Sequence, residues 1–174
     1  TQEVSTTCWG LDRLPSLNKG QSFTAPATGT LESLDMALQS NAPDEFSPNA
    51  GAPASGVVIA IFEGAGFDGN ELHRQTVTTP HGSGSVTPMV TYQIDGTVNL
   101  VTGQVYTIGL ALETAGSGGV CGTSSDVYGG GSYYNNGIAN DEADATFRVT
   151  MLPPSPTQSP STAPTPFGTV TQEV

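Results

Sequence analysis

The sequence contains very little positive charge. Its 174 residues include four lysines and arginines against sixteen aspartates and glutamates, which gives a formal net charge of −12. Proteins that bind nucleic acid neutralise its phosphates with Lys and Arg. Nucleic acid is therefore not an expected partner, and neither is an anionic membrane surface, for the same reason. No stretch approaches the ~20 apolar residues of a membrane-spanning helix, so no membrane insertion is expected.

Other features are missing as well. There is no initiating Met and no signal peptide, which suggests a mature product or an excised segment. No segment shows a sustained 3.6-residue apolar period, and the composition is rich in turn residues, with 22 Gly and 13 Pro. Short runs with apolar residues at every second position predict strands instead. The predicted strands are residues 21–25, 30–38, 57–62, 72–78, 89–94, 97–101, 104–112 and 143–151.

A glycine motif follows the most apolar of these runs. Residues 64–69 read G-A-G-F-D-G, which matches the G-x-G-x-x-G turn of dinucleotide-binding proteins. That turn requires a following helix, but residues 70–80 are too short and too β-branched to form one. The motif therefore predicts a turn between two strands, 57–62 and 72–78.

The remaining segments are expected to be irregular. They are residues 1–18, anchored by Cys8 and Trp9, the proline-containing loop 40–55 and the glycine-rich segment 115–140. Asp95-Gly96 predicts a tight hairpin between residues 89–94 and 97–101. Eight or so short strands with frequent turns predict an all-β fold, a jelly-roll-like antiparallel β-sandwich spanning residues 1–152.

The two cysteines, Cys8 and Cys121, are expected to form a disulfide. Neither lies in a C-x-x-C motif, and the two histidines lack a ligand-like spacing. A single bridge spanning most of the domain, in a chain almost without lysine, favours an oxidising, extracellular location. A catalytic thiol or a metal pair is the alternative.

The composition changes abruptly at Pro153. Residues 153–166 read PPSPTQSPSTAPTP, which predicts an extended Pro/Ser/Thr-rich linker, or stalk, that suits O-glycosylation. Residues 167–174 follow as a terminal strand or as the start of the next repeat. The candidate O-glycosylation sites are Ser155, Thr157, Ser159, Ser161, Thr162 and Thr165.

Several of these segments together resemble a known group of domains. The segments are GQSFTAPATGTLESLDMAL, VVIAIFEGAGFDGNEL, VTGQVYTIGLAL, YGGGSYYNNG and DEADATFRV. They resemble a jelly-roll β-sandwich domain of secreted and cell-surface proteins, adhesin-like or similar to carbohydrate-binding modules, over residues 20–151. The stalk is similar to those of algal and microbial surface glycoproteins. The resemblance implies an adhesive, carbohydrate-associated or structural module without enzymatic activity.

Catalytic and binding patterns are weak. Ser117 lies in a relaxed nucleophile-elbow pattern, but no helix follows it, as that turn requires. Acidic residues gather before the last strand, where Asp141, Glu142 and Asp144 are candidate ligands of a structural Ca²⁺. A solvated acidic rim is the alternative, and no cofactor is required. Tyr128, Tyr133 and Tyr134 are candidates for sugar stacking, or two of them fill the end of the sandwich.

The chain ends resemble each other. Residues 1–4 and 171–174 both read TQEV, which favours one period of a tandem array. Alternatively, separate subunits polymerise when a terminal strand adds to a neighbour's sheet. The predicted function is a structural unit of an extracellular filament or surface glycoprotein, with copies of itself as partners. The alternative is a carbohydrate-binding or adhesive module whose partners are glycans. The assembly strand consists of Thr169, Val170, Thr171, Gln172, Glu173 and Val174.

The stalk yields the first testable prediction. A segment so poor in apolar residues cannot bury itself, and O-linked sugar would stiffen and protect it. The intact mass of the native protein should therefore exceed that of the bare polypeptide, and the excess should map to residues 155–165. A mass equal to that of the bare chain would contradict this prediction.

Overall fold

The computed structural model describes residues 7–41, 56–79, 88–113 and 117–154, and these residues form an all-β domain. Every strand pairing between its fourteen strands is antiparallel, and the described residues contain no helix. The last strand ends at Leu152, immediately before the predicted stalk. The predicted all-β class is confirmed for the described residues.

The strands form three sheets. The largest has the order β12 (Ile138–Asn140), β11 (Tyr133–Asn135), β2 (Lys19–Thr24), β9 (Val105–Leu112), β5 (Val57–Glu63) and β6 (Glu71–Val77). A second sheet contains β1 (Thr7–Gly10), β10 (Ser117–Thr123), β13 (Asp144–Ala145) and β4 (Leu38–Asn41). The third contains β14 (Phe147–Leu152), β3 (Gly29–Met36), β7 (Val90–Gln93) and β8 (Asn99–Leu100).

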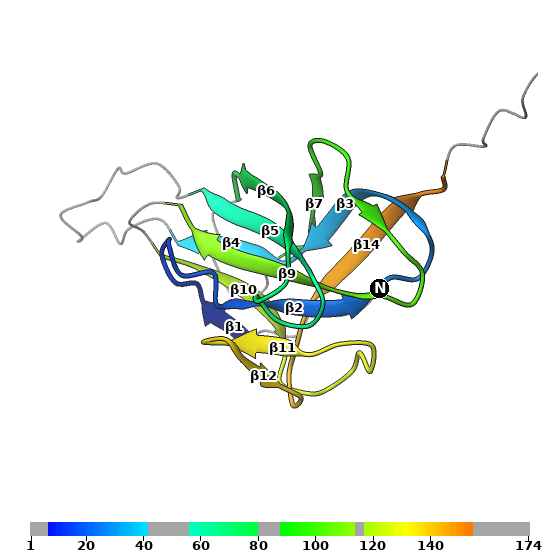
Figure 1. The fold of residues 1–174 in the computed structure, drawn as a ribbon. Helices are drawn as coiled ribbons and strands as arrows, with labels where there is room; N and C mark the ends of the chain where they lie inside the picture. Colours follow the sequence, from blue (N-terminus) through cyan, green and yellow to red (C-terminus); the bar gives the residue numbers. More distant parts are fainter. Residues whose placement is uncertain (1–6, 42–55, 80–87, 114–116, 155–174) are drawn as a thin grey trace, which may run out of the picture.

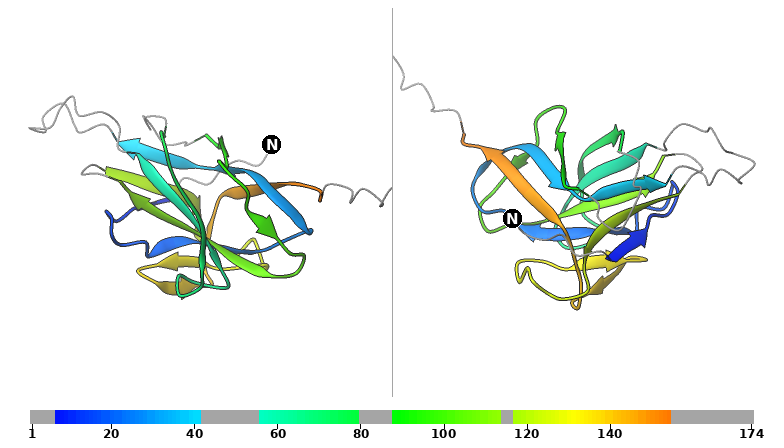
Figure 2. Two further views of the ribbon diagram at one scale, coloured as in Figure 1. Left: turned by 45° about the horizontal axis from the view of Figure 1, so that its top comes forward. Right: turned by 180° about the vertical axis from the view of Figure 1, so that it is seen from behind.

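The sheets are arranged in two layers. In Figure 1 the six-stranded sheet lies in front, and the other two sheets lie behind it. The view from behind in Figure 2 shows β14, β10 and β1 in front. One apolar cluster joins the layers, with Ile59 and Ile108 from the six-stranded sheet, Leu34 from β3 and Val120 from β10. This arrangement is compatible with a β-sandwich, because each layer buries its apolar face against the other.

The hairpin around the glycine motif is confirmed. β5 pairs with β6 on one edge and with β9 on the other, and residues 57–62 are all buried. Gly64 and Gly66 have φ angles of 79° and 92°. Residues other than glycine rarely adopt such positive φ angles. The Thr107 hydroxyl holds this turn, donating to the Gly64 carbonyl (2.8 Å) and accepting from the Gly66 N–H (2.9 Å).

The predicted hairpin at Asp95-Gly96 is wrong. Strands β7 and β8 do not pair with each other; both pair with β3, one after the other along the same strand. The Ile94 N–H donates to the Glu32 carbonyl, and the Leu31 N–H donates to the Val98 carbonyl. Residues 94–98 therefore interrupt a single line of pairing, and Gly96, with a φ of 96°, allows the detour without a reversal of the chain.

Two segments expected to be irregular contain strands. Residues 7–10 form β1, and the glycine-rich segment contains β10, β11 and β12. β10 has the sequence SGGVCGT, and its glycines hide any alternating pattern. Glycine is required at least at Gly122, where an added Cβ would lie 2.0 Å from the Asp144 carbonyl oxygen.

The close packing of strands β2 and β9 gives a stability prediction. An added Cβ at Gly20 would lie 2.0 Å from the Ile108 carbonyl oxygen, whereas one at Gly10 would meet nothing within 4 Å. Gly20→Ala should therefore lower the free energy of unfolding by about 1–3 kcal/mol because of overpacking. Gly10→Ala is the matched control and should stay within ~0.5 kcal/mol of the parent protein. Urea unfolding of both variants tests this, and equal effects would contradict the register of β2 on β9.

Candidate functional site

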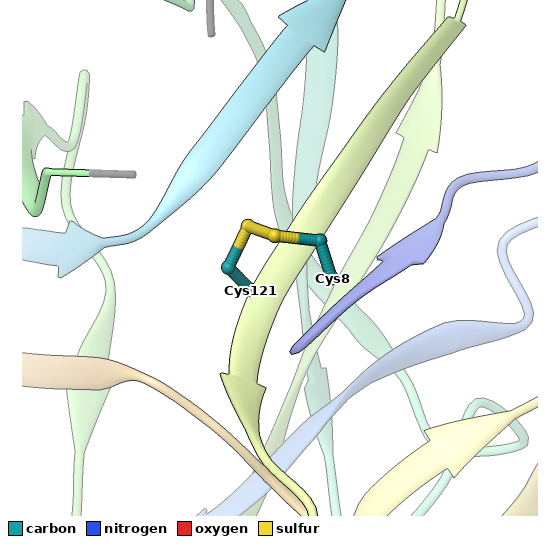
Figure 3. The surroundings of a disulfide bond; sticks show 2 residues. All are labelled: Cys8 and Cys121. Atoms are coloured by element: carbon teal, nitrogen blue, oxygen red, sulfur yellow. A yellow bond between two sulfur atoms is a disulfide. The ribbon is translucent and has the colours of Figure 1, made fainter. Parts of the chain in front are cut away.

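The predicted disulfide is present and links neighbouring strands. Cys8 on β1 lies directly opposite Cys121 on β10, with a Cα–Cα distance of 4.0 Å. Figure 3 shows the bridge crossing from the short β1 to the long β10. Cys121 is buried. The bridge therefore attaches an edge strand of only four residues to a strand inside the sheet.

Cys121 also lies where three strands meet. The Cys121 N–H donates to the Ala37 carbonyl (2.8 Å), the Ala37 N–H donates to the Thr146 carbonyl (3.3 Å), and the Thr146 N–H donates to the Cys121 carbonyl (2.9 Å). These three hydrogen bonds close a ring at the points where β3 leads into β4 and β13 leads into β14. We call Ala37, Cys121 and Thr146 the three-strand junction. It joins the second sheet to the third.

Next to the junction, the first described strand lies close to the start of the last strand. Gly122, next to the disulfide, pairs with Thr7 on one side and with Ala145 on the other. β14 begins two residues after Ala145 and continues to Leu152. The first described residues of the chain are thus covalently tied to the strand that supports the start of the last strand.

Two of the three candidate sugar-stacking tyrosines are buried. Tyr133 has no exposed surface, and its ring stacks on Trp9 with a centroid distance of 4.5 Å. Burial raises the pKa of Tyr133, and the negative charge of Asp12 raises it further. Tyr134 is also buried and packs edge-on against Phe67. Neither ring offers a free face to a sugar. Tyr133 belongs to the core cluster between the two layers, whereas Tyr134, the next residue of β11, lies on the opposite face of the sheet.

Tyr128 has a different environment. It is half-buried, its ring packs edge-on against Phe147 at 5.2 Å, and its hydroxyl accepts a hydrogen bond from the Thr24 N–H. Of the three candidates it alone keeps appreciable exposure, and its ring is already engaged with a side chain of β14.

The candidate calcium ligands do not converge. The buried Asp144 accepts hydrogen bonds from the Gln21 side-chain amide (3.1 Å) and from the backbone N–H groups of Val127 and Tyr128 (both 2.8 Å). Asp141 accepts one from the Ser132 hydroxyl, and Glu142 is exposed. Within residues 7–41, 56–79, 88–113 and 117–154, no three His, Cys, Asp or Glu residues are placed to hold a metal ion.

A polar cluster that the sequence analysis missed surrounds Lys19. Lys19 is the only lysine in the chain, and it is 8% exposed. Its Nζ donates to the Asn135 Oδ1 (2.7 Å) and the Asn136 Oδ1 (3.2 Å), and lies 3.5 Å from the Asp12 Oδ2. Lysine is rarely buried without partners. The predicted strand began at residue 21, so the only signal in the sequence was a single lysine two residues before it.

The remaining candidate residues lie in a strand or outside the described part of the chain. Ser117 is a residue of strand β10 rather than of a strand-to-helix turn. The O-glycosylation sites and the assembly strand lie outside the described residues. In the described part of the chain there is no helix of the length and apolarity needed to cross a membrane.

Comparison of the chain with protein-family models, with curated proteins and with solved structures found no significant match.

The geometry of Asp144 gives the second stability prediction. Replacing Asp144 by Ala leaves the Gln21 amide and two backbone N–H groups without their acceptor, which should cost about 3 kcal/mol or more in the free energy of unfolding. Asp126→Ala, at an exposed position in the preceding turn, is the control. Urea unfolding in Ca²⁺ and in EDTA should give the same loss for Asp144→Ala. If Ca²⁺ stabilises the parent protein and not this variant, the role of Asp144 as a structural acceptor is wrong.

Proposed function

We propose that this chain is a structural unit of an extracellular filament or surface glycoprotein, in which β-domains alternate with Pro/Ser/Thr-rich stalks. The observation that carries the proposal is the placement of the two chain ends around the three-strand junction. A unit that works in series must receive the chain at one place and release it at another.

The described domain has this property. Thr7 lies beside Gly122, which also pairs with Ala145. From Ala145 the chain runs along β14 to Leu152, roughly 20 Å away at ~3.3 Å per residue. Figure 1 accordingly shows β1 at the lower left and the end of β14 at the upper right. A following stalk of fourteen extended residues would add up to ~40 Å to the spacing of successive domains.

The disulfide supports both the location and the role. A disulfide is stable in an oxidising compartment, which favours an extracellular protein. In a filament under tension, the edge strand β1 would be pulled away easily, because it has only four residues and pairs only with β10. The Cys8–Cys121 bond prevents this, since it passes the pull directly to a central strand. We assign the domain no enzymatic activity in this role.

Two forms of assembly fit the proposal. In a covalent array, residues 171–174 of one unit are residues 1–4 of the next. In a polymer of separate subunits, residues 169–174 add to a free sheet edge of a neighbour. Edge strands β6 and β14, with seven and six residues, are long enough to accept such a strand. A jelly-roll-like connectivity of the sandwich belongs to the same proposal.

The alternative function, a carbohydrate-binding or adhesive module, has less support. Two of the three tyrosines proposed to stack on sugars are buried. Specific binding on a glycan array, lost in a Tyr128→Ala variant, would favour this alternative over the structural one.

Denaturing gel electrophoresis of the native material under reducing conditions tests the proposal and separates its two forms. A covalent array predicts a ladder or very large species. A polymer predicts one band at the subunit size, 17.8 kDa plus any glycan, and large particles before denaturation. A particle that is monomeric by native mass spectrometry, with a transcript encoding one copy, would rule out both forms.

A further inference from the structure

The cluster around the single lysine has the components of a self-forming covalent cross-link. An amine, a carboxamide and a carboxylate meet at Lys19, Asn135 and Asp12, with Nζ 2.7 Å from the Asn135 Oδ1 and 3.5 Å from the Asp12 Oδ2. A lysine amine becomes a nucleophile when it is held next to a base. The hydrogen bond holds Nζ beside the Asn135 carboxamide, whose Cγ is bonded to the accepting Oδ1, and holding two reacting groups together in this way lowers the barrier to their reaction.

We propose that Lys19 and Asn135 form an intramolecular isopeptide bond that joins strands β2 and β11. Asp12 transfers the protons in this reaction. The proposal concerns the domain itself and does not depend on whether the domain assembles into filaments.

The strand register places the two side chains on the same face. Tyr133 pairs with Gln21 and Tyr134 with Gly20, so the next pair in the register is Asn135 and Lys19. Side chains alternate between the faces of a sheet, and Lys19 therefore shares a face with Gln21, and Asn135 with Tyr133. Gln21 reaches Asp144 on β13, and Tyr133 stacks on Trp9 of β1. This face is directed at the second layer, so the reacting groups lie at the end of the space between the layers.

The surroundings of the cluster favour the reaction. Lys19 is 8% exposed, and Tyr133, two residues from Asn135 on the same face, has no exposed surface, while the Asp12 side chain is 44% exposed and lies at the edge of the cluster. The Tyr133 hydroxyl is buried without a hydrogen-bond partner and is close enough to Asp12 for its charge to raise the pKa of that hydroxyl.

The turn holds the amide in place. Asn136 and Gly137, between β11 and β12, have φ angles of 55° and 75°, the conformation of a tight hairpin turn. The Gly137 N–H donates to the Asn18 carbonyl (2.7 Å), which fixes the turn against the residue preceding Lys19. The Asn135 amide is therefore held next to the amine by backbone contacts on both strands.

The steps balance without another reactant. The Asp12 carboxylate takes one proton from the Lys19 ammonium, and the freed Nζ lone pair attacks the Asn135 Cγ, moving the carbonyl electrons onto Oδ1. Asp12 then returns its proton to the Asn135 Nδ2. The Cγ–Nδ2 bond breaks, the C=O bond re-forms and Nζ loses a second proton to the departing ammonia. An ammonium and a carboxamide thus become a secondary amide and one ammonium ion.

Tryptic digestion of the reduced, alkylated and denatured full chain tests the proposal. Trypsin cleaves after Lys19 only if its amine is free. The chain contains only four trypsin sites, at Arg13, Lys19, Arg74 and Arg148. The cross-link predicts that fragment 14–74 stays intact and is joined to fragment 75–148, with a mass equal to their sum minus one NH₃. Complete release of fragments 14–19 and 20–74 with unmodified masses would overturn the proposal.

Variants identify the reacting groups. Lys19→Arg keeps the positive charge, restores cleavage after position 19 and should fold, which shows that loss of the cross-link is not loss of the domain. Asp12→Asn should leave Lys19 and Asn135 unlinked. Asn135→Ala should abolish the cross-link and Asn136→Ala should retain it. A cross-link that survives Asn135→Ala, or that forms fully in Asp12→Asn, would contradict the assigned roles.

Discussion

The ring of three backbone hydrogen bonds at Ala37, Cys121 and Thr146 is the constraint on which the rest of the domain depends. It forms where β3 leads into β4 and where β13 leads into β14, so two long runs of chain separate there to accommodate β10. The second and third sheets become one layer through this contact. The disulfide adds β1 to the same point, because its buried sulfur belongs to the central residue of the ring.

The sequence predicts the parts of the fold that have regular patterns. The apolar run of β5 and the alternation of β9 identify two neighbouring inner strands of the largest sheet. β10 was missed because glycines replace the alternating apolar residues. At Gly122 the reason is steric, since the neighbouring backbone leaves no room for a Cβ. Asp95-Gly96 wrongly predicted a hairpin, because a turn sequence also suits a short detour after which the chain continues along the same partner strand. Asp144 was assigned to calcium because a sequence does not show that two backbone N–H groups and an amide already bind its carboxylate.

The two covalent links, one present in the structure and one proposed, have the same mechanical consequence. Cys8–Cys121 and Lys19–Asn135 each connect the first part of the chain to the last. Either bond therefore removes most of the central strands from the covalent path between Cys8 and the stalk. A domain linked in this way transmits tension between its ends while the apolar core carries little of it, which suits a unit that repeats along a filament.

The role of the Cys8–Cys121 bond in carrying tension is tested most directly by the extension of a single domain pulled by its ends. The Lys19→Arg variant isolates the effect of the disulfide. With the disulfide intact, unfolding should release only the segment from Cys121 to Leu152, roughly 30 residues or ~110 Å at ~3.5 Å per residue. After reduction, the same variant should release about 145 residues, or ~500 Å. Equal extensions before and after reduction would contradict the claim that the Cys8–Cys121 bond carries the load between the two ends of the domain.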